Sequence, residues 1–499
     1  MPEDVFLSSY TKLNREQKKA VDAIEGPVMV IAGPGTGKTS ILTLRIANIL
    51  RKTDTPPNGV LALTFTESAV HSMRKKLFEY IGASTYRVHL YTFHGFAQEI
   101  ITRYPEYFPR IIGGIIATDS ERYEIIEQAL TKGEFAIIRP FGEPFFYVRK
   151  ALGAIQDIKR EGVTPEDFFN LLLKEEARIL SSADLYHEKG RSKGLMKREH
   201  KEALKNNAKN KELGTLYASY EGLLKDRKLY DYDDMLLELV RALKEEEELL
   251  RTLQEEYLYI LADEHQDANN SQNAILELLS DYRETRNLFI VGDEKQAIYR
   301  FQGASLENFL YFKKKFQDAE VIFLDHNYRS TQNILDATHA LMTATSKEEI
   351  PRPRLLRASS ENLEERLIHT LAFTSESDEL LGLAHRLKEK IRQGVPPENI
   401  AVLVRTNREI DILGRTFSGF GIPHTLFTDD DVLTDRDISK LLILLRAIVY
   451  PENDVLVGSM FLIDFLGLNP IDAVKLNREA YEKRLPPLEI LATESLRSE

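Results

Sequence analysis

The chain has 499 residues, 43% of them hydrophobic, and a formal net charge of -12 at pH 7. A chain of this length usually divides into about three domains, and its hydrophobic content is enough to give each one a buried core. It contains no cysteine, which excludes disulfides, thiolate metal sites and cysteine nucleophiles. The negative net charge argues against a generally basic nucleic-acid coat, but it allows a local groove whose residues facing phosphate are positive.

Membrane association is not expected. No apolar run is long enough to cross a bilayer, and the start, MPEDVFLSSYTKLNREQ, has neither a basic leader nor an apolar stretch behind it. We therefore expect a cytoplasmic protein with no membrane partner.

Short apolar runs alternate with amphipathic helical patterns from the start of the chain. Helical patterns at 41–50 and 68–80 each follow an apolar run, and this rhythm predicts βαβ units and a parallel sheet. A long helical stretch, 120–250, then interrupts the rhythm, and we interpret it as an insertion in one α/β domain. The strand-like segments on either side of it are 28–32, 60–65, 257–262, 287–291 and 321–324.

A second α/β pattern follows His326. It has strand-like segments at 367–373 and 400–404, with a helical pattern at 375–392 between them. From residue 427 the pattern is helical to the end of the sequence.

Nine Lys or Arg residues lie between Lys189 and Lys211, within the long helical stretch. Such a run is typical of a solvated helical hairpin, and equally of an arm that contacts phosphates. The sequence leaves both interpretations open.

The segment from Gly33 to Thr39, GPGTGKT, lies between the strand-like PVMVIA and the helical pattern ILTLRIANIL. It fits G-x-x-x-x-G-K-[ST] in the context that this phosphate-binding pattern requires. Glycines let the loop turn its N–H groups toward phosphate, and the helix N-terminus adds partial positive charge. Lys38 would reach the β and γ phosphates of ATP, and Thr39 would offer its hydroxyl to Mg²⁺. The predicted ATP-binding residues of this loop are Ala32, Gly33, Pro34, Gly35, Thr36, Gly37, Lys38 and Thr39.

An acidic pair, Asp263 and Glu264, ends the strand-like segment 257–262. The carboxyl ends of parallel strands are where α/β sheets bind ligands. Asp263 would hold Mg²⁺ through water, and Glu264 would orient or deprotonate the water that attacks the γ phosphate. Alone, such a pair is as often a helix cap, but together with the phosphate loop it favours catalysis.

Three segments resemble motifs II, III and IV of the UvrD/Rep-like superfamily 1 DNA helicases: DEHQDANNSQ at 263–272, VGDEKQAIYRFQGA at 291–304 and LDHNYRS at 324–330. The family's Q motif, motif Ia and the motif after it are resembled by LNREQKKAV at 13–21, LALTFTESAV at 61–70 and YTFHGFA at 91–97. All lie in family order. Weaker similarity continues in IAVLVRTN at 400–407 and FGIPHTLF at 420–427.

The resemblance implies an α/β fold, with a P-loop RecA-like motor domain that contains a parallel sheet and a helical insertion, and a partial second RecA-like domain. We expect the first motor domain at 1–110 and 214–312, with the helical insertion at 111–213. The first part of the second RecA-like domain would be 313–426, and 427–499 would begin a second helical insertion that is truncated.

The resemblance also implies further residues of the ATP site. Gln17 would contact the adenine edge, and Tyr328 would stack on the adenine face. Gln296 would sense the γ phosphate and couple it to strand binding, and Arg329 would reach across from the second domain as an arginine finger when the domains close. Without the phosphate loop, a capping Gln, a core Tyr and a surface Arg would be the better explanations.

For DNA, the resemblance implies backbone contacts from Thr92 and His94 and base stacking by Phe65, Tyr299 and Phe301. Stacking tolerates any base sequence while polar contacts follow the phosphates, which suits single-stranded DNA or a 3'-tailed duplex. Aromatic residues beside strand ends are, however, more often part of a core.

Motifs V and VI of the family do not occur before Glu499. We therefore expect either a fragment of a longer chain or a natural short form that works with a protein partner supplying the missing motor elements. Two functions stay open. One is an ATP-driven motor that moves 3'-to-5' on single-stranded DNA in repair or replication, and the other is an ATP-binding and DNA-binding module or partner subunit that does not unwind DNA by itself.

Overall fold

The computed structural model describes residues 2–140, 144–187, 193–282, 286–296, 312–345, 355–359, 367–427, 436–451, 453–483 and 485–492. The chain forms two compact units, Met1–Ile368 and His369–Glu499. No helix in these ranges is long and apolar enough to cross a membrane.

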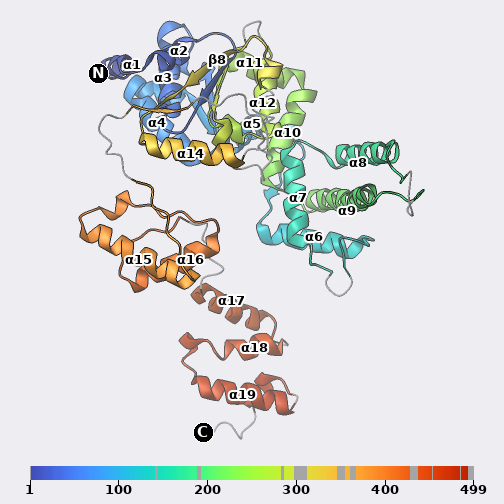
Figure 1. Cartoon of the computed structure of the whole chain (residues 1–499). Coiled ribbons are helices and arrows are strands. Elements are labelled where there is room, and N and C mark those ends of the chain that lie inside the picture. The colour runs from blue at the N-terminus through green and yellow to red at the C-terminus, as the bar shows by residue number, and fades with distance from the viewer. Residues whose placement is uncertain are drawn as a thin grey trace. The chain divides into compact units, whose positions relative to one another are not determined.

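A six-stranded parallel sheet forms the centre of the first unit (Figure 1). Its strand order is β3-β2-β6-β7-β1-β8, so strands from both sides of the long helical stretch lie beside one another. The predicted α/β fold is therefore confirmed, and all five predicted strands of this sheet are present. The strands are β1 (Val28–Ala32), β2 (Val60–Thr64), β3 (His89–Thr92), β6 (Tyr259–Ala262), β7 (Leu288–Gly292) and β8 (Glu320–Leu324).

Helices cover both faces of this sheet, as its apolar strands require. On one face, side chains such as Met29 and Ile290 pack against α5, α10, α11 and α12. On the other face, the alternate residues Val30 and Val291 pack against α2, α3 and α4. Together with the N-terminal helix, the helices of this part of the chain are α1 (Pro2–Thr11), α2 (Arg15–Asp22), α3 (Lys38–Lys52), α4 (Glu67–Ile81), α5 (Phe93–Arg103), α10 (Tyr232–Glu245), α11 (Glu247–Glu256) and α12 (Asn270–Ser280).

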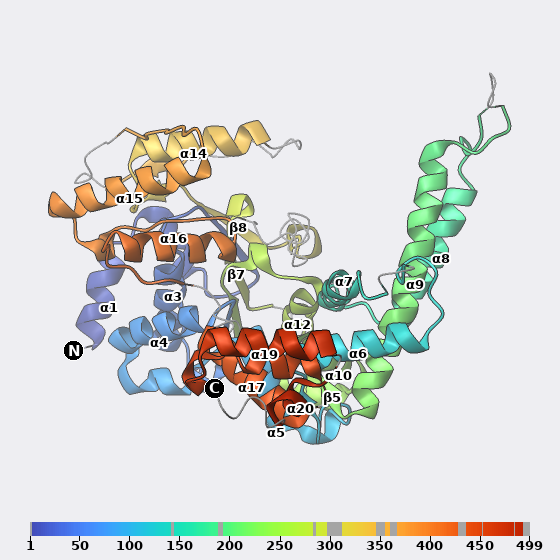
Figure 2. The same cartoon turned by 90° about the horizontal axis from the view of Figure 1, so that it is seen from below.

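The predicted helical insertion forms its own core between β3 and β6, from side chains of α6, α7 and α9. Helices α8 and α9 pack against each other as a projecting arm (Figures 1 and 2), fixed by the bond from Asn207 Nδ2 to Leu172 O at 3.0 Å. Helix α9 runs without a break across residue 213, where we expected the insertion to end. The elements are β4 (Ile115–Ile116), α6 (Asp119–Lys132), α7 (Val148–Arg160), α8 (Pro165–Leu180), α9 (Arg198–Asp226) and β5 (Leu229–Tyr230).

A buried ion cluster joins the insertion to α10. The ammonium group of Lys159, on α7, is fully buried and lies 2.5 Å from Glu221 on α9. The same nitrogen lies 2.7 Å from Asp231 and 2.8 Å from Asp234, at the start of α10. Arg110 adds a second cation, 3.1 Å from Asp234. Three carboxylates therefore surround one ammonium group where the insertion meets the sheet domain.

The first unit continues beyond residue 312, where we expected the first RecA-like domain to end. Strand β8 pairs in parallel with β1, so the sheet extends to Leu324. Strands β9 (His326–Asn327) and β10 (Arg357–Ala358) then form a small parallel pair, and α14 (Gln332–Thr345) lies between them in the chain.

The second unit is helical in the ranges that the structure describes. Helices α15 (Glu376–Arg392) and α16 (Asn407–Gly419) share a small core that includes Ala384 and Phe417. The predicted helix at 375–392 is confirmed by α15. A separate core joins the last four helices, which are α17 (Arg436–Val449), α18 (Asp454–Met460), α19 (Pro470–Lys483) and α20 (Pro487–Ala492).

The predicted strands at 367–373 and 400–404 are wrong as secondary structure, because neither segment is a strand. Both are exposed, with Leu367 81% and Leu403 92% accessible. A strand exists only beside a hydrogen-bonded neighbour, and no other strand lies in the described part of this unit. The apolar pattern shows that these residues would be favourable in a buried strand. It does not show that a partner strand is present.

Candidate nucleotide and DNA sites

The phosphate loop connects β1 to α3 at the carboxyl edge of the sheet. Gly37 caps α3 in the left-handed conformation, with φ of 91°, and Gly35 has φ of 69°. Side chains rarely adopt these angles, so glycine is required at both turns. Thr36 closes the loop by donating from its hydroxyl to Gly33 O at 2.8 Å.

Asn327 fixes the phosphate loop from the side of β9. Its amide nitrogen donates to Pro34 O, and its Oδ1 accepts from the backbone N–H of Arg329 at 2.8 Å and of Ser330 at 2.7 Å. A Cβ atom placed on Gly35 would lie 2.6 Å from Arg329 Cβ and 2.8 Å from Asn327 Nδ2. Close packing is therefore a second reason for glycine at position 35.

Lys38 and Glu264 meet at one point, although β1 and β6 are not neighbours in the sheet. The distance from Lys38 Nζ to Glu264 Oε2 is 2.7 Å, and the Lys38 side chain is only 10% exposed. Gln266 Nε2 donates to the same carboxylate oxygen at 2.8 Å. The structure thus brings together the loop cation and the acid that the sequence assigned to water activation.

Asp263 lies at the end of β6 and is 5% exposed. Burial, and then the nearby charge of Glu264, raises its pKa to about 6. Its Oδ1 accepts the backbone N–H of Glu264 at 2.9 Å. The described residues give the carboxylate no other hydrogen bond, which leaves Oδ2 for a cation. An Asp carboxylate and the Thr39 hydroxyl are oxygen ligands of the kind that Mg²⁺ prefers, so the residues fit that metal.

Gln296 lies beyond the end of β7, which separates β6 from β1. Its side-chain nitrogen donates to Asp293 Oδ2 at 2.7 Å, and the backbone N–H of Asp293 donates to Gln266 Oε1 at 2.9 Å. Gln266 therefore links Glu264 to the segment that holds Gln296. We missed this role, and that of Asn327, although both residues stand inside the motifs that we quoted.

On the expected adenine side, Gln17 is buried and already engaged. Its Nε2 donates to Thr36 O at 2.9 Å, and its Oε1 accepts the backbone N–H of Asn14 at 3.0 Å in a capping box. Tyr328 is 45% exposed, not a core residue, and its hydroxyl accepts from Asn14 Nδ2 at 3.0 Å. Gln17 thus has a capping role in the structure, and Tyr328 leaves much of its ring open.

Arg329 is exposed and belongs to the same unit as the phosphate loop. We expected it to arrive from the second domain on closure. In the structure the Cβ of Arg329 lies close to Gly35, and the N–H of the neighbouring Tyr328 donates to Gly35 O at 2.9 Å.

The structure describes only some of the residues that were expected to contact DNA. Thr92 ends β3 and caps α5, accepting from the N–H of Gly95 at 3.0 Å and donating to Glu67 at 2.9 Å, so the only proton of its hydroxyl is already used. Phe65 follows β2, the neighbour of β3, and is half-buried. Tyr299 and Phe301 lie outside the described residues.

His94 lies in the first turn of α5, and its Nε2 is buried without a hydrogen-bond partner among the described residues. Burial, and then the charge of Arg160, lowers the pKa of His94 to about 4. The imidazole is therefore neutral at pH 7. It offers a DNA phosphate neither a positive charge nor an accessible Nε2.

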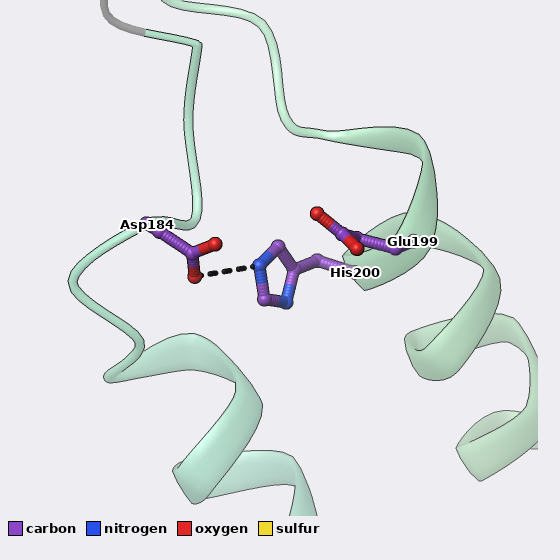
Figure 3. A group of neighbouring side chains, drawn as sticks. All are labelled: Asp184, Glu199 and His200. Atoms are coloured by element: carbon purple, nitrogen blue, oxygen red, sulfur yellow. Dashed lines mark hydrogen bonds and ion pairs between the residues drawn. The ribbon is translucent and has the colours of Figure 1, made fainter.

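A separate group of titratable side chains, Asp184, Glu199 and His200, lies at the end of the arm (Figure 3). Asp184 accepts hydrogen bonds from Ser182 at 2.6 Å and pairs with His200 Nε2 at 3.0 Å. The ammonium of Lys197 lies 3.0 Å from its other oxygen. Because Lys197 already supplies a cation, the group is explained as a tie between the end of α8 and the start of α9.

Comparison with known proteins gives the family of this chain. The UvrD/REP helicase N-terminal domain matches residues 13–317, and the UvrD-like helicase C-terminal domain matches residues 322–480. The chain belongs to the UvrD/Rep helicase family.

Individual UvrD/Rep helicases are similar along nearly the whole chain. The ATP-dependent DNA helicase PcrA of Staphylococcus aureus is 28% identical over 96% of the chain, which corresponds to 59% of that protein. PcrA of Staphylococcus epidermidis is also 28% identical, over 96% of the chain and 60% of its own length. The chain thus spans about three fifths of the length of these relatives.

Proposed function

We propose that this protein hydrolyses ATP with Mg²⁺ and couples hydrolysis to 3'-to-5' movement on single-stranded DNA, in DNA repair or replication. The observation that carries the proposal is the convergence of Lys38 and Glu264, 2.7 Å apart, at the carboxyl edge of the parallel sheet. Family membership and the names of the relatives, which are ATP-dependent DNA helicases, support the choice of substrates.

Hydrolysis would begin with an exchange of partners at Lys38. When the β and γ phosphates enter the loop, the ammonium turns from Glu264 to the phosphates, and the Glu264 carboxylate is released to accept a proton from water. Gln266 keeps that carboxylate in place through its 2.8 Å bond. Mg²⁺ on Asp263 and Thr39 would neutralise phosphate charge.

Coupling to DNA would run through β7. Gln296 lies just beyond the end of this strand, and its partner Asp293 is bonded through Gln266 to Glu264. A γ phosphate that moves Gln296 would therefore also move the segment 297–304, which contains the proposed stacking residues Tyr299 and Phe301. Arg329, beside Gly35, would stabilise charge in the transition state. Gln17 would hold the adenine edge, and Tyr328 would stack on its face.

Three substitutions test the nucleotide site. Lys38→Ala should abolish hydrolysis and weaken nucleotide binding. Glu264→Gln should still bind Mg-ATP but turn over at least about a hundredfold more slowly, since a general base contributes on that scale. Asp263→Asn should lose the part of the nucleotide affinity that depends on Mg²⁺. Unchanged turnover in Lys38→Ala, or the same affinity loss in both acid variants, would contradict the assignment.

Movement on DNA needs its own test, because an ATP-binding and DNA-binding module that does not unwind would pass the first one. We expect oligo-dT to stimulate hydrolysis and a 3'-tailed duplex to be displaced faster than a 5'-tailed one. If oligo-dT stimulates hydrolysis but neither duplex is displaced, the function is instead that of an ATP-binding and DNA-binding module that works with a protein partner.

A further inference from the structure

The backbone of Gly33, the first residue of the phosphate loop, does not require glycine, because its φ is not positive. The side chain of Leu356 explains the glycine instead. A Cβ atom placed on Gly33 would lie 2.7 Å from Leu356 Cδ1 and 3.0 Å from Leu356 Cδ2. Glycine at this position therefore allows the leucine to lie directly against the loop, a close approach that any other residue would disturb.

Leu356 is half-buried, and its backbone is fixed from two directions. Gln332, the first residue of α14, donates from Nε2 to Leu356 O at 3.1 Å and accepts the N–H of Ala358 on Oε1 at 2.9 Å. The N–H of Arg357 donates to Asp325 O at 2.8 Å, which joins β10 to the segment that follows β8. The place of Leu356 beside the loop is therefore set by hydrogen bonds of its own segment.

The phosphate loop is held from outside at the residues that follow Gly33. The carbonyl groups of residues 34–36 each accept a hydrogen bond from a residue outside the loop. The N–H groups of Gly35 and Gly37, by contrast, donate to nothing in the part of the chain that the structure describes, which leaves them for phosphate. The carbonyl of Gly33 accepts only from within the loop. At this residue the outside support is the side chain of Leu356.

We propose that Leu356 is a positioning residue of the nucleotide site, which holds the phosphate loop in its binding shape before nucleotide arrives. This inference rests on the ATP-binding part of the proposed function and adds a residue outside the motifs of the sequence resemblance. A preformed loop loses less conformational entropy when it binds a ligand. Bound phosphates order the loop by themselves, so the contribution of Leu356 lies in nucleotide affinity and not in the turnover of bound ATP.

The test is the affinity of the whole chain for a fluorescent ATP analogue, together with the rate of hydrolysis at saturating ATP. Leu356→Ala should weaken binding about tenfold, which corresponds to about 1.4 kcal/mol. Its kcat should stay within about twofold of wild type, as expected when only ground-state binding is lost. Leu356→Met should bind like wild type, because it conserves the volume of the side chain. The matched control is Leu355→Ala, because Leu355 is adjacent in the chain but 58% exposed.

A double variant separates direct support of the loop from a general loss of stability. Gly33→Ala places a methyl group against Leu356, and Leu356→Ala removes the atoms that it would meet. Gly33→Ala should therefore weaken nucleotide binding much less in the Leu356→Ala background than in wild type.

Equal effects of Gly33→Ala in the two backgrounds would overturn the inference but leave the proposed function intact. The same holds for a Leu356→Ala protein that binds the analogue like wild type, or that loses kcat and keeps its affinity. A wild-type protein that binds the analogue but does not hydrolyse ATP would overturn the proposed function alone. A wild-type protein that binds no nucleotide would overturn both.

Discussion

Asn327 satisfies three backbone groups at once, and it does so next to the phosphate loop. It donates to Pro34 O and accepts from the N–H groups of Arg329 and Ser330. The side chain is completely buried. No other amino acid offers a donor and an acceptor in this arrangement except Gln, whose side chain is longer. Asn327 therefore fixes both the loop and the proposed arginine finger.

Asn327→Ala should destabilise the first unit and weaken nucleotide binding. Buried groups left without partners cost about 1–3 kcal/mol, and the loop would lose its support beside Gly35. The measurements are the free energy of unfolding in urea and the affinity for a fluorescent ATP analogue. Asn206→Ala, on the exposed surface of α9, is the matched control. Equal behaviour of the two variants would show that Asn327 has no such role.

The sequence predicted the loop and the acids of the site because each has a local signature. Lys38 and Glu264 are recognised from the glycines before one and the apolar strand before the other. Which residues connect them could not be predicted, because the links of Gln266 to Asp293 and of Asn327 to Pro34 join segments far apart in the chain. The motif that contains His94 also does not show that its side chain is buried. This burial is what removes the charge of His94 at pH 7.

At the level of elements, α7, α9 and α10 meet at the ammonium of Lys159. Replacing Lys159 by Met should cost about 3–5 kcal/mol of unfolding free energy, because the acids around it would be left buried without their cation. Urea unfolding would measure this loss. Lys205→Met, on the exposed surface of α9, controls for the change of residue type. A loss no larger than that of the control would mean that Arg110 alone neutralises the cluster.

The same cluster should make stability depend on pH. Burial raises the pKa of Asp234 to about 7, well above its ordinary value, so the folded protein favours the protonated form. The stabilising contribution is complete below the ordinary pKa and is lost as the pH rises through about 7, by at most about 4 kcal/mol.

Asp234→Asn removes this titration. The unfolding free energy of wild type minus that of the variant should therefore fall between pH 5 and pH 8 in urea unfolding at several pH values. A difference that is constant with pH, or that grows, would contradict the raised pKa.

Strands were predicted correctly where the apolar pattern itself indicates that the strand is buried between neighbouring strands. Strands β1, β2, β6, β7 and β8 were expected because buried parallel strands are continuous apolar runs. The segments 367–373 and 400–404 carry a similar pattern, yet they are not strands in the structure. Apolar residues in such a pattern favour burial. Whether they are buried depends on neighbouring strands, which the local sequence does not describe.

At the level of the whole molecule, the two units should differ in local stability. The segments 367–373 and 400–404 have neither helical nor strand structure and are almost entirely exposed. Strands β1 and β7 lie inside the sheet. Amide exchange reports such differences because it requires hydrogen bonds to open.

In hydrogen–deuterium exchange, peptides from 367–373 and 400–404 should exchange within the shortest labelling time, while peptides from β1 and β7 stay protected far longer. Excess ATP should slow exchange at the phosphate loop more than in either segment. Protection of the two segments equal to that of β1 would show that they are paired in solution.

The strand order also governs when the site can exist during protein synthesis. Val28, before the phosphate loop, pairs with Phe289 on one side and with Glu320 on the other. These are contacts of very high sequence separation, and such contacts form late and slowly. The insertion, built from helices near one another in the chain, can fold while the ribosome is still translating β6. The nascent chain therefore presents its glycine-rich loop long before the neighbouring strands β7 and β8 have been synthesised. The loop gains its full support only after Asn327 has left the exit tunnel.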